Sequence, residues 1–105
     1  FELQTILEEL GFEILATASD GENGFRLIQS LQPDIVTLDI VMPGLDGVEL
    51  LKRIISLNRQ TKIIMISALG KHQTILECLK LGADNFIEKP FVKSQIIEVF
   101  KKYLA

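Results

Sequence analysis

The hydrophobic positions along this chain follow two alternating spacings. Apolar residues recur at intervals of three and four, the spacing of one helix face, in five segments. These segments are residues 3–10, 25–31, 48–55, 75–79 and 96–104. Between them lie four short strand-like runs, at residues 13–18, 34–39, 63–66 and 85–88. Two of these runs, which read IVTL and IIMI, are almost wholly apolar, which is typical of strands buried on both faces.

The regular alternation of helix and strand predicts an α/β domain. Short strands separated by helices favour a parallel sheet with helices on both of its faces. The 105 residues fit a single domain, residues 1–105, and we find no internal repeat, low-complexity tract or linker. An open α/β fold normally begins with a strand, whereas this chain begins inside a helix. We therefore expect the domain to be incomplete at its N-terminus.

Composition and charge narrow the class of protein. The net charge is −3 and there is no basic block, which argues against nucleic-acid binding. The apolar runs are far shorter than the ~20 residues of a membrane span. The single cysteine, Cys78, cannot form an internal disulfide, which suits a reducing compartment. The sequence therefore predicts a cytoplasmic domain that binds neither nucleic acid nor membrane.

Three polar residues stand where successive predicted strands end: Asp39, Ser67 and Lys89. In open α/β sheets, ligands bind beyond the carboxyl ends of the strands, so these side chains are expected at one edge of the sheet. A carboxylate can attack a phosphoryl group, an ammonium can neutralise the transferred charge, and a hydroxyl can hydrogen-bond its oxygens. Taken singly, each has a common structural explanation as a helix cap, a strand-end hydroxyl or a solvated charge. Taken together, they predict a phosphoryl site.

Three motifs carry a resemblance to a known family. The sequence LDIVMPGLDGVELL, in which Asp39 is followed by Pro43 and Gly47, resembles the phosphorylation loop of response-regulator receiver domains. IIMISA and GADNFIEKPF resemble that family's fourth strand and its fifth-strand Lys-Pro signature. The resemblance covers essentially the whole chain. The chain is similar to single-domain chemotaxis-type regulators, and receivers attached to output domains look alike at this level. The resemblance implies a flavodoxin-like fold, a doubly wound parallel sheet with strand order 2-1-3-4-5.

The resemblance also implies a role for each residue of the site. Asp39 would be the phosphoacceptor, and Lys89 would contact the phosphoryl group. Ser67 would be the switch hydroxyl that moves toward the phosphate, and Phe86 would be the aromatic rotamer switch. Ala68 would be the small residue that leaves the phosphate site accessible. An ordinary core aromatic is the alternative interpretation of Phe86.

Further roles follow from the same resemblance. Asp39 and the backbone carbonyl of Val41 would be metal ligands. Gly47 would serve close backbone packing or an unusual dihedral angle. The resemblance implies that the bond between Lys89 and Pro90 is cis, and X-Pro is the only common context for a cis bond.

One feature departs from the family's pattern. Receivers carry an acidic pair at the end of their first strand, and this pair holds Mg²⁺. The chain has neither that strand nor that pair, and Asp20 cannot replace them because it follows the second strand. Magnesium needs octahedral oxygen ligation, so we expect Mg²⁺ binding only with the missing N-terminal pair. An absent N-terminal segment, a strand from another chain in a dimer or strand-exchanged oligomer, and a degenerate receiver are the three explanations.

The leading hypothesis is a phosphoacceptor in a two-component system, a signalling module rather than an enzyme. Its partners would be a sensor histidine kinase and a downstream target or output domain, contacted through residues 72–103. The alternative is a pseudo-receiver that binds proteins without being phosphorylated. A phosphatase-like enzyme is disfavoured because such enzymes need a second aspartate two residues after the nucleophile, where this chain has Val41.

Overall fold

The structure is a computed structural model that describes residues 2–41, 44–57 and 60–104. Its helices are α1 (Glu2–Glu9), α2 (Gly21–Leu31), α3 (Gly47–Ser56), α4 (His72–Leu81) and α5 (Lys93–Phe100), and a 3-10 turn, η1 (Lys101–Tyr103), follows α5. Its strands are β1 (Ile35–Asp39), β2 (Lys62–Ala68) and β3 (Asn85–Lys89). Among the described residues, no helix combines the length and the apolarity needed to cross a membrane.

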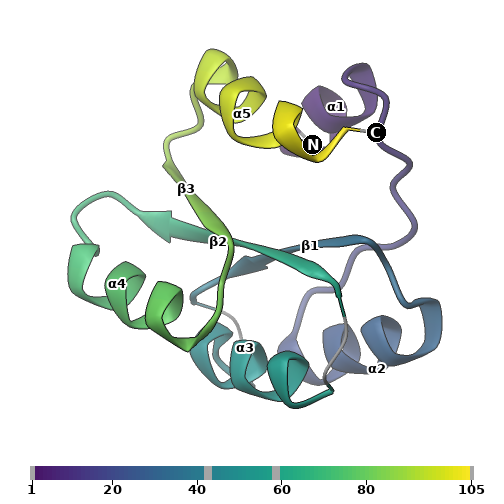
Figure 1. Ribbon diagram of the computed structural model, residues 1–105, viewed down its shortest axis with the longest axis vertical. Coiled ribbons are helices and arrows are strands. Elements are labelled where there is room, and N and C mark those ends of the chain that lie inside the picture. Colours follow the sequence, from purple (N-terminus) through teal and green to yellow (C-terminus); the bar gives the residue numbers. More distant parts are fainter. Residues whose placement is uncertain (1, 42–43, 58–59, 105) are drawn as a thin grey trace.

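The three strands form a parallel sheet in the order β1-β2-β3 (Figure 1). In its register, Asp39 lies beside Ile66, and Ala68 lies beside Lys89. All three strands therefore finish at the same edge of the sheet, as the sequence predicted. This edge is where parallel strands can bring side chains from distant parts of a chain together.

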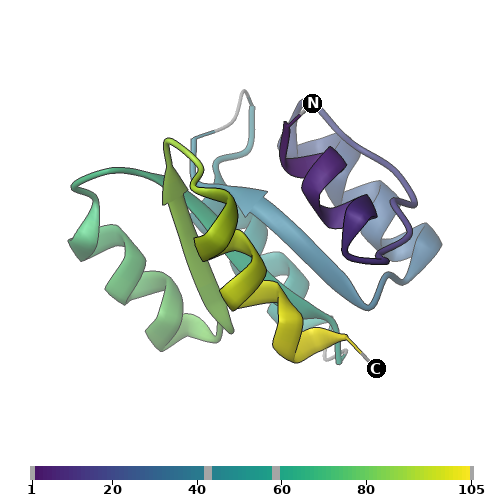
Figure 2. The same cartoon turned by 90° about the horizontal axis from the view of Figure 1, so that it is seen from above.

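Helices cover both faces of the sheet, which confirms the predicted doubly wound architecture. Figure 1 shows α2, α3 and α4 on one face and α1 and α5 on the other, and Figure 2 shows the second pair from above. Met65 packs into the core beneath the first group, while its neighbours in β2, Ile64 and Ile66, pack beneath α1 and α5. Because both faces are covered, β2 is buried along Ile63–Ser67, which explains its unbroken apolar run.

Local signals set the ends of the helices. Asp20 caps α2 by accepting a hydrogen bond from the Asn23 amide, so α2 begins several residues before the apolar pattern predicted. The Gly82 amide closes α4 by donating to two carbonyls of its last turn, as expected. The last helix is shorter than predicted, because the chain tightens into η1 after Phe100.

The predicted strand at residues 13–18 is wrong. These residues run without regular secondary structure from α1 to α2, on the β1 side of the sheet (Figures 1 and 2). In the receiver order 2-1-3-4-5, the strand at this position pairs only with strand 1. No described residues supply that strand here, so the segment lacks the hydrogen-bonded neighbour that a ladder requires.

Candidate functional site

The central feature of the carboxyl edge is an ion pair between β1 and β3. The Lys89 Nζ lies 2.7 Å from the Asp39 Oδ2, and the two strands are separated by β2. The side chains are 49% and 33% exposed, so solvent and small solutes reach both. An ion pair this accessible contributes little to stability. Its consequence is positional, because it holds an ammonium directly beside a carboxylate oxygen.

The other carboxylate oxygen of Asp39 is also oriented. The Val41 amide donates a 3.1 Å hydrogen bond to Oδ1, so the carboxylate is held between a backbone donor and an ammonium. Sequence reasoning considered only the carbonyl of Val41 and missed its N–H. The signal was available, because aspartate often accepts a hydrogen bond from the amide two residues later.

Ser67 lies on the central strand but does not point its hydroxyl at Asp39. It is 1% exposed, and its Oγ donates to the Ala68 carbonyl at 2.9 Å. The structure thus brings Asp39 and Lys89 together and places Ser67 one strand away, bonded to the backbone. Ala68 is exposed beside it, where β2 ends next to Lys89.

Phe86 lies three residues before Lys89, at the position predicted for the aromatic switch. It is partly buried, pairs with Met65 across β2 and β3, and packs against the core on the α2–α4 face. Both interpretations of this aromatic residue, as a switch and as part of the core, are compatible with this position.

The chain returns close to Asp39 at Gly47, the first residue of α3. A Cβ added there would lie 2.3 Å from the Asp39 carbonyl oxygen, closer than real Cβ atoms come. Gly47 is absent from the residues with positive φ, so close packing, and not an unusual dihedral, is what requires glycine. Pro43, in the loop after β1, lies outside the described residues. The bond between Lys89 and Pro90 is cis, as expected.

The described residues do not by themselves fit a Mg²⁺ ion. No group of three or more His, Cys, Asp or Glu side chains gathers anywhere in residues 2–41, 44–57 and 60–104. The Asp39 carboxylate is engaged by Lys89 and Val41. One carboxylate and one backbone carbonyl fall well short of the six oxygens that magnesium prefers.

Cys78 plays no part in this edge. It is fully buried in the core on the α2–α4 face. Burial raises the pKa of its thiol, and the nearby carboxylates of Glu77 and Asp46 raise it further. A neutral, inaccessible thiol is a poor nucleophile, so the chemistry of this edge belongs to oxygen and nitrogen groups.

Sequence comparisons connect this arrangement to known proteins. The family model described as response regulator receiver domain matches residues 1–101. The chemotaxis protein CheY of Thermotoga maritima is 37% identical over 100 residues, which cover 95% of this chain and 83% of that protein. CheY of Bacillus subtilis is also 37% identical, over 97% of this chain and 85% of its own length.

Solved structures give the same result for the fold. CheY in the CheX-CheY-BeF3-Mg²⁺ complex from Borrelia burgdorferi superimposes with a TM-score of 0.89 at 39% identity, covering 99% of this chain and 80% of that one. The receiver domain of NtrX from Brucella abortus superimposes with a TM-score of 0.88 at 34% identity, covering 96% and 85%. The flavodoxin-like fold expected from the sequence is thereby confirmed.

Proposed function

The chain belongs to the response-regulator receiver family, and we propose that Asp39 is the residue on which it takes up a phosphoryl group. Receiver domains are signalling phosphoacceptors rather than conventional enzymes, and they interact with histidine kinases and downstream targets. The observation that carries the assignment is the 2.7 Å contact between Lys89 Nζ and Asp39 Oδ2 at the carboxyl edge of the sheet. A nucleophile held beside a fixed cation is what phosphoryl transfer requires of a protein.

The reaction is a displacement at phosphorus. A carboxylate oxygen of Asp39 attacks the phosphorus of a phosphohistidine, and a P–O bond forms as the P–N bond breaks. The imidazole leaves with the electron pair of that bond, and Asp39 becomes an acyl phosphate. With acetyl phosphate as donor, a P–O bond breaks instead and acetate leaves. Lys89 offsets the negative charge on the transferred group in both cases.

We propose that Mg²⁺ takes part only when acidic residues outside the described chain complete its site. Receiver domains of the CheY type bind Mg²⁺ in general, and the Borrelia CheY complex contains Mg²⁺ and BeF3. The outer edge of β1 has no paired strand among the described residues, so a further strand can align there beside Asp39. Such a strand, ending in an acidic pair, would supply the oxygen ligands that Asp39 and the Val41 carbonyl lack.

The signal would pass from the phosphorylated site to a partner-binding surface. Ser67 would turn toward the phosphate, and Phe86 would fill the space that it leaves, a shift between two packings. The partner surface would be residues 72–103, which comprise α4, β3, α5 and η1. Its charged and polar members Lys80, Lys93, Gln95 and Lys101 are exposed. A cytoplasmic location, where kinase and target would meet it, is part of the same proposal.

The pseudo-receiver alternative is not favoured. A domain that only binds proteins has no need of a carboxylate paired with an ammonium and a backbone amide at an accessible strand end. Both partners of Asp39 are in place in this structure. The family's phosphoacceptor chemistry therefore explains the site better than a binding role alone.

The decisive experiment compares two aspartates of the same loop. The full-length natural protein is incubated with acetyl phosphate and Mg²⁺, and mass spectrometry measures phosphoryl incorporation. Asp39→Asn should show none, because an amide is not a comparable nucleophile. Asp46→Asn is the matched control, because its side chain caps α3 through the Glu49 amide and asparagine caps equally well. Labelling that persists in Asp39→Asn would assign the acceptor elsewhere.

A further inference from the structure

We propose that Gly21, the first residue of α2, is a positioning residue for the phosphoacceptor loop. The inference rests on the function proposed for Asp39. Gly21 is buried, and a Cβ added to it would lie 2.5 Å from the Leu45 carbonyl oxygen and 2.6 Å from the Leu45 Cβ. Both distances are below the 3.0 Å that real Cβ atoms respect. The start of α2 therefore rests directly against the loop that follows Asp39.

A second close approach, between Gly47 and the Asp39 backbone, links Leu45 to the proposed acceptor. Two residues after Leu45, a Cβ at Gly47 would lie 2.3 Å from the Asp39 carbonyl oxygen and 2.6 Å from the Ile40 Cα. The Gly47 amide also donates a 2.9 Å hydrogen bond to the Ile40 carbonyl. The loop is thus held on one side by α2 and on the other by the end of β1, and both contacts exist only because glycine stands there.

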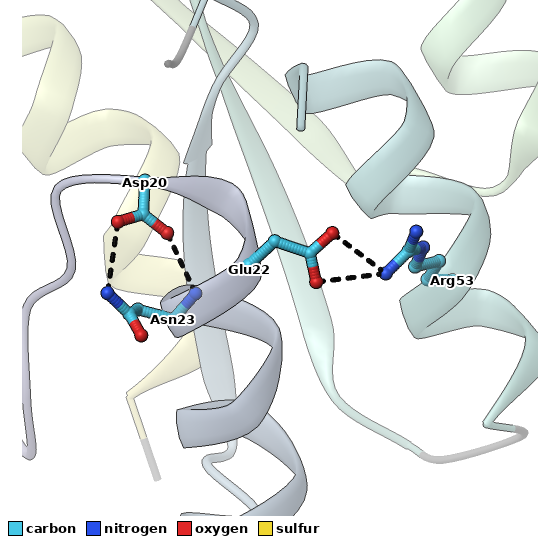
Figure 3. A network of polar contacts seen from close by, with 4 residues as sticks. All are labelled: Asp20, Glu22, Asn23 and Arg53. Carbon is cyan, nitrogen blue, oxygen red and sulfur yellow. Dashed lines mark hydrogen bonds and ion pairs between the residues drawn. The ribbon is translucent and has the colours of Figure 1, made fainter. Parts of the chain in front are cut away.

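Polar side chains surround the first turn of α2 (Figure 3). Asp20 accepts hydrogen bonds from the backbone and side-chain nitrogens of Asn23, at 2.9 and 3.0 Å. Glu22 pairs with Arg53 of α3 at 3.4 Å, and the Arg53 guanidinium lies 5.7 Å from the centre of the Phe25 ring. The Asp20 bonds order the first turn itself, and the Glu22–Arg53 pair is too exposed to add much stability.

The firmer link between the two helices is the core, where Ile28 of α2 belongs to the same buried cluster as Leu51 and Ile54 of α3. Leu45 is only partly buried, so we expect extra volume at the start of α2 to displace Leu45 rather than the helix.

A moved loop changes the geometry of the acceptor. Leu45 is joined through Asp46 to Gly47, which presses on the Asp39 backbone, and Val41 of the same loop donates to Oδ1. Phosphoryl transfer depends on the attacking oxygen being correctly placed, and small misplacements cost large factors in rate. Gly21 touches no reacting atom, so its effect is on the position of Asp39 and not on the chemistry itself.

Three glycine-to-alanine variants test the proposal in the full-length natural protein. Gly21→Ala carries the clash. Gly24→Ala is the matched control in the same helix, because its Cβ would make only ordinary contacts, the nearest at 3.7 Å from the Ala18 Cβ. Gly82→Ala, at the C-terminal cap of α4, controls for destabilisation. Gly82 has φ +126°, and a Cβ added to it would lie 2.7 Å from the Ile55 Cδ1 of α3.

Each variant is measured by initial rate of phosphorylation from acetyl phosphate, by melting temperature, and by the NMR shift of the Val41 amide. We expect Gly21→Ala to lose about tenfold or more in rate and to shift the Val41 amide. Gly24→Ala should match the wild type. Gly82→Ala should melt earlier while keeping its rate and its Val41 shift. Equal phosphorylation rates for Gly21→Ala and Gly24→Ala would overturn the proposal. A loss of rate in Gly82→Ala as large as that in Gly21→Ala would also overturn it.

A measurement on the unmodified protein covers the case in which Gly21→Ala fails to fold. Phosphorylation should shift the amide resonances of Gly21 and Asn23 more than that of Gly11, at the end of α1. Unshifted Gly21 and Asn23 amides in a fully phosphorylated sample would overturn the positioning role alone. A wild type that takes up no phosphoryl group would overturn the assignment of Asp39, and this inference with it.

Discussion

The two edges of β1 differ in what lies beside them. On the inner edge, all five residues of Ile35–Asp39 pair with Lys62–Ile66 of β2. On the outer edge, no described strand pairs with it, and residues 13–18 pass on that side without regular secondary structure. The apolar pattern of the chain predicted a strand at residues 13–18. A strand-like sequence is therefore not sufficient, because β structure depends on the neighbour that completes its hydrogen bonds.

The difference bears directly on the site. The paired inner edge fixes the backbone of Asp39 relative to β2, and β2 fixes Lys89 through Ala68. These pairings place Asp39 and Lys89 without help from the outer edge. The metal ligands, by contrast, would have to come from the outer edge. The proposed phosphoacceptor and its ammonium partner are in contact in this structure, whereas the proposed metal ligands would depend on a further strand.

The largest expected effect is a difference in the free energy of unfolding between substitutions on the two sides of β1. Ile64 is fully buried on β2, paired with Thr37, whereas Ile14 is only partly buried beyond the outer edge. Ile64→Ala should lower the free energy of unfolding by about 2–5 kcal/mol, because it opens a cavity in a closely packed core. Ile14→Ala should cost about 1 kcal/mol, in the range of ordinary substitutions. Urea denaturation followed by circular dichroism measures both, and equal losses would show that the outer side is packed as firmly as the inner.

A second prediction fills the outer edge. A form of the protein with a strand paired to that edge should convert residues 13–18 into a strand, because alternate residues of the segment would then have backbone hydrogen-bond partners. Amide hydrogen exchange at Ile14 and Ala16 should slow by about a hundredfold, or ~3 kcal/mol. The amides of Ile64 and Met65, already in the paired sheet, serve as the internal reference. Exchange at residues 13–18 that stays as fast as in this chain would mean that the segment does not respond to a neighbour.

The elements that the sequence predicted correctly differ from the one that it predicted wrongly in whether they depend on a neighbouring strand. Elements whose signals are local were predicted: the buried run of β2, the stop of α4 at Gly82 and the succession of strand ends at Asp39, Ser67 and Lys89. The strand at residues 13–18 was predicted wrongly, because its formation depends on a neighbour that the pattern within the segment cannot reveal.

Within the site, residue types were predictable and orientations were not. The sequence pattern placed Asp39 and Lys89 at one edge of the sheet, and the structure joins them in an ion pair across β2. It could not show that the Ser67 hydroxyl bonds to the Ala68 carbonyl, because a side-chain rotamer depends on its packed surroundings. Nor could it show that Gly21 meets Leu45, a contact between residues brought together only by the fold.

The third prediction concerns that Ser67 rotamer. Ser67→Ala removes the hydroxyl that would turn toward the phosphate but leaves Asp39 and Lys89 unchanged. Asp39 should still be phosphorylated in this variant. The gain in affinity for a downstream partner that phosphorylation causes should be smaller than in the wild type. Allosteric couplings of this kind are typically about 1–3 kcal/mol, so a gain of roughly 5–150-fold in affinity should shrink toward none. Titrations of phosphorylated and unphosphorylated protein against the partner measure it, and an undiminished gain would remove Ser67 from the switch.

The smallest expected effect concerns the lifetime of the acyl phosphate. In this family the positions two residues after the acceptor and two after the switch hydroxyl flank the path of the attacking water. Here they are Val41 and Leu69, residues that are 80% and 72% exposed just beyond the ends of β1 and β2. Neither side chain can donate or accept a hydrogen bond to place a water molecule. Both can shield the phosphoryl group, so spontaneous loss of phosphate should be slow.

Replacing Val41 with Asn and Leu69 with Glu should speed that loss by about tenfold, equivalent to ~1.4 kcal/mol in the barrier. The double variant keeps Asp39 and Lys89, and the backbone amide that donates to Oδ1 survives because only side chains change. Phosphate release is followed in wild type and variant at the same Mg²⁺ concentration, after the donor is removed. Leu76→Gln, on the exposed face of α4, is the control for adding a polar group at an exposed leucine, and it should leave the rate unchanged. A double variant that loses phosphate no faster than the wild type would mean that the two side chains point away from the path of the water.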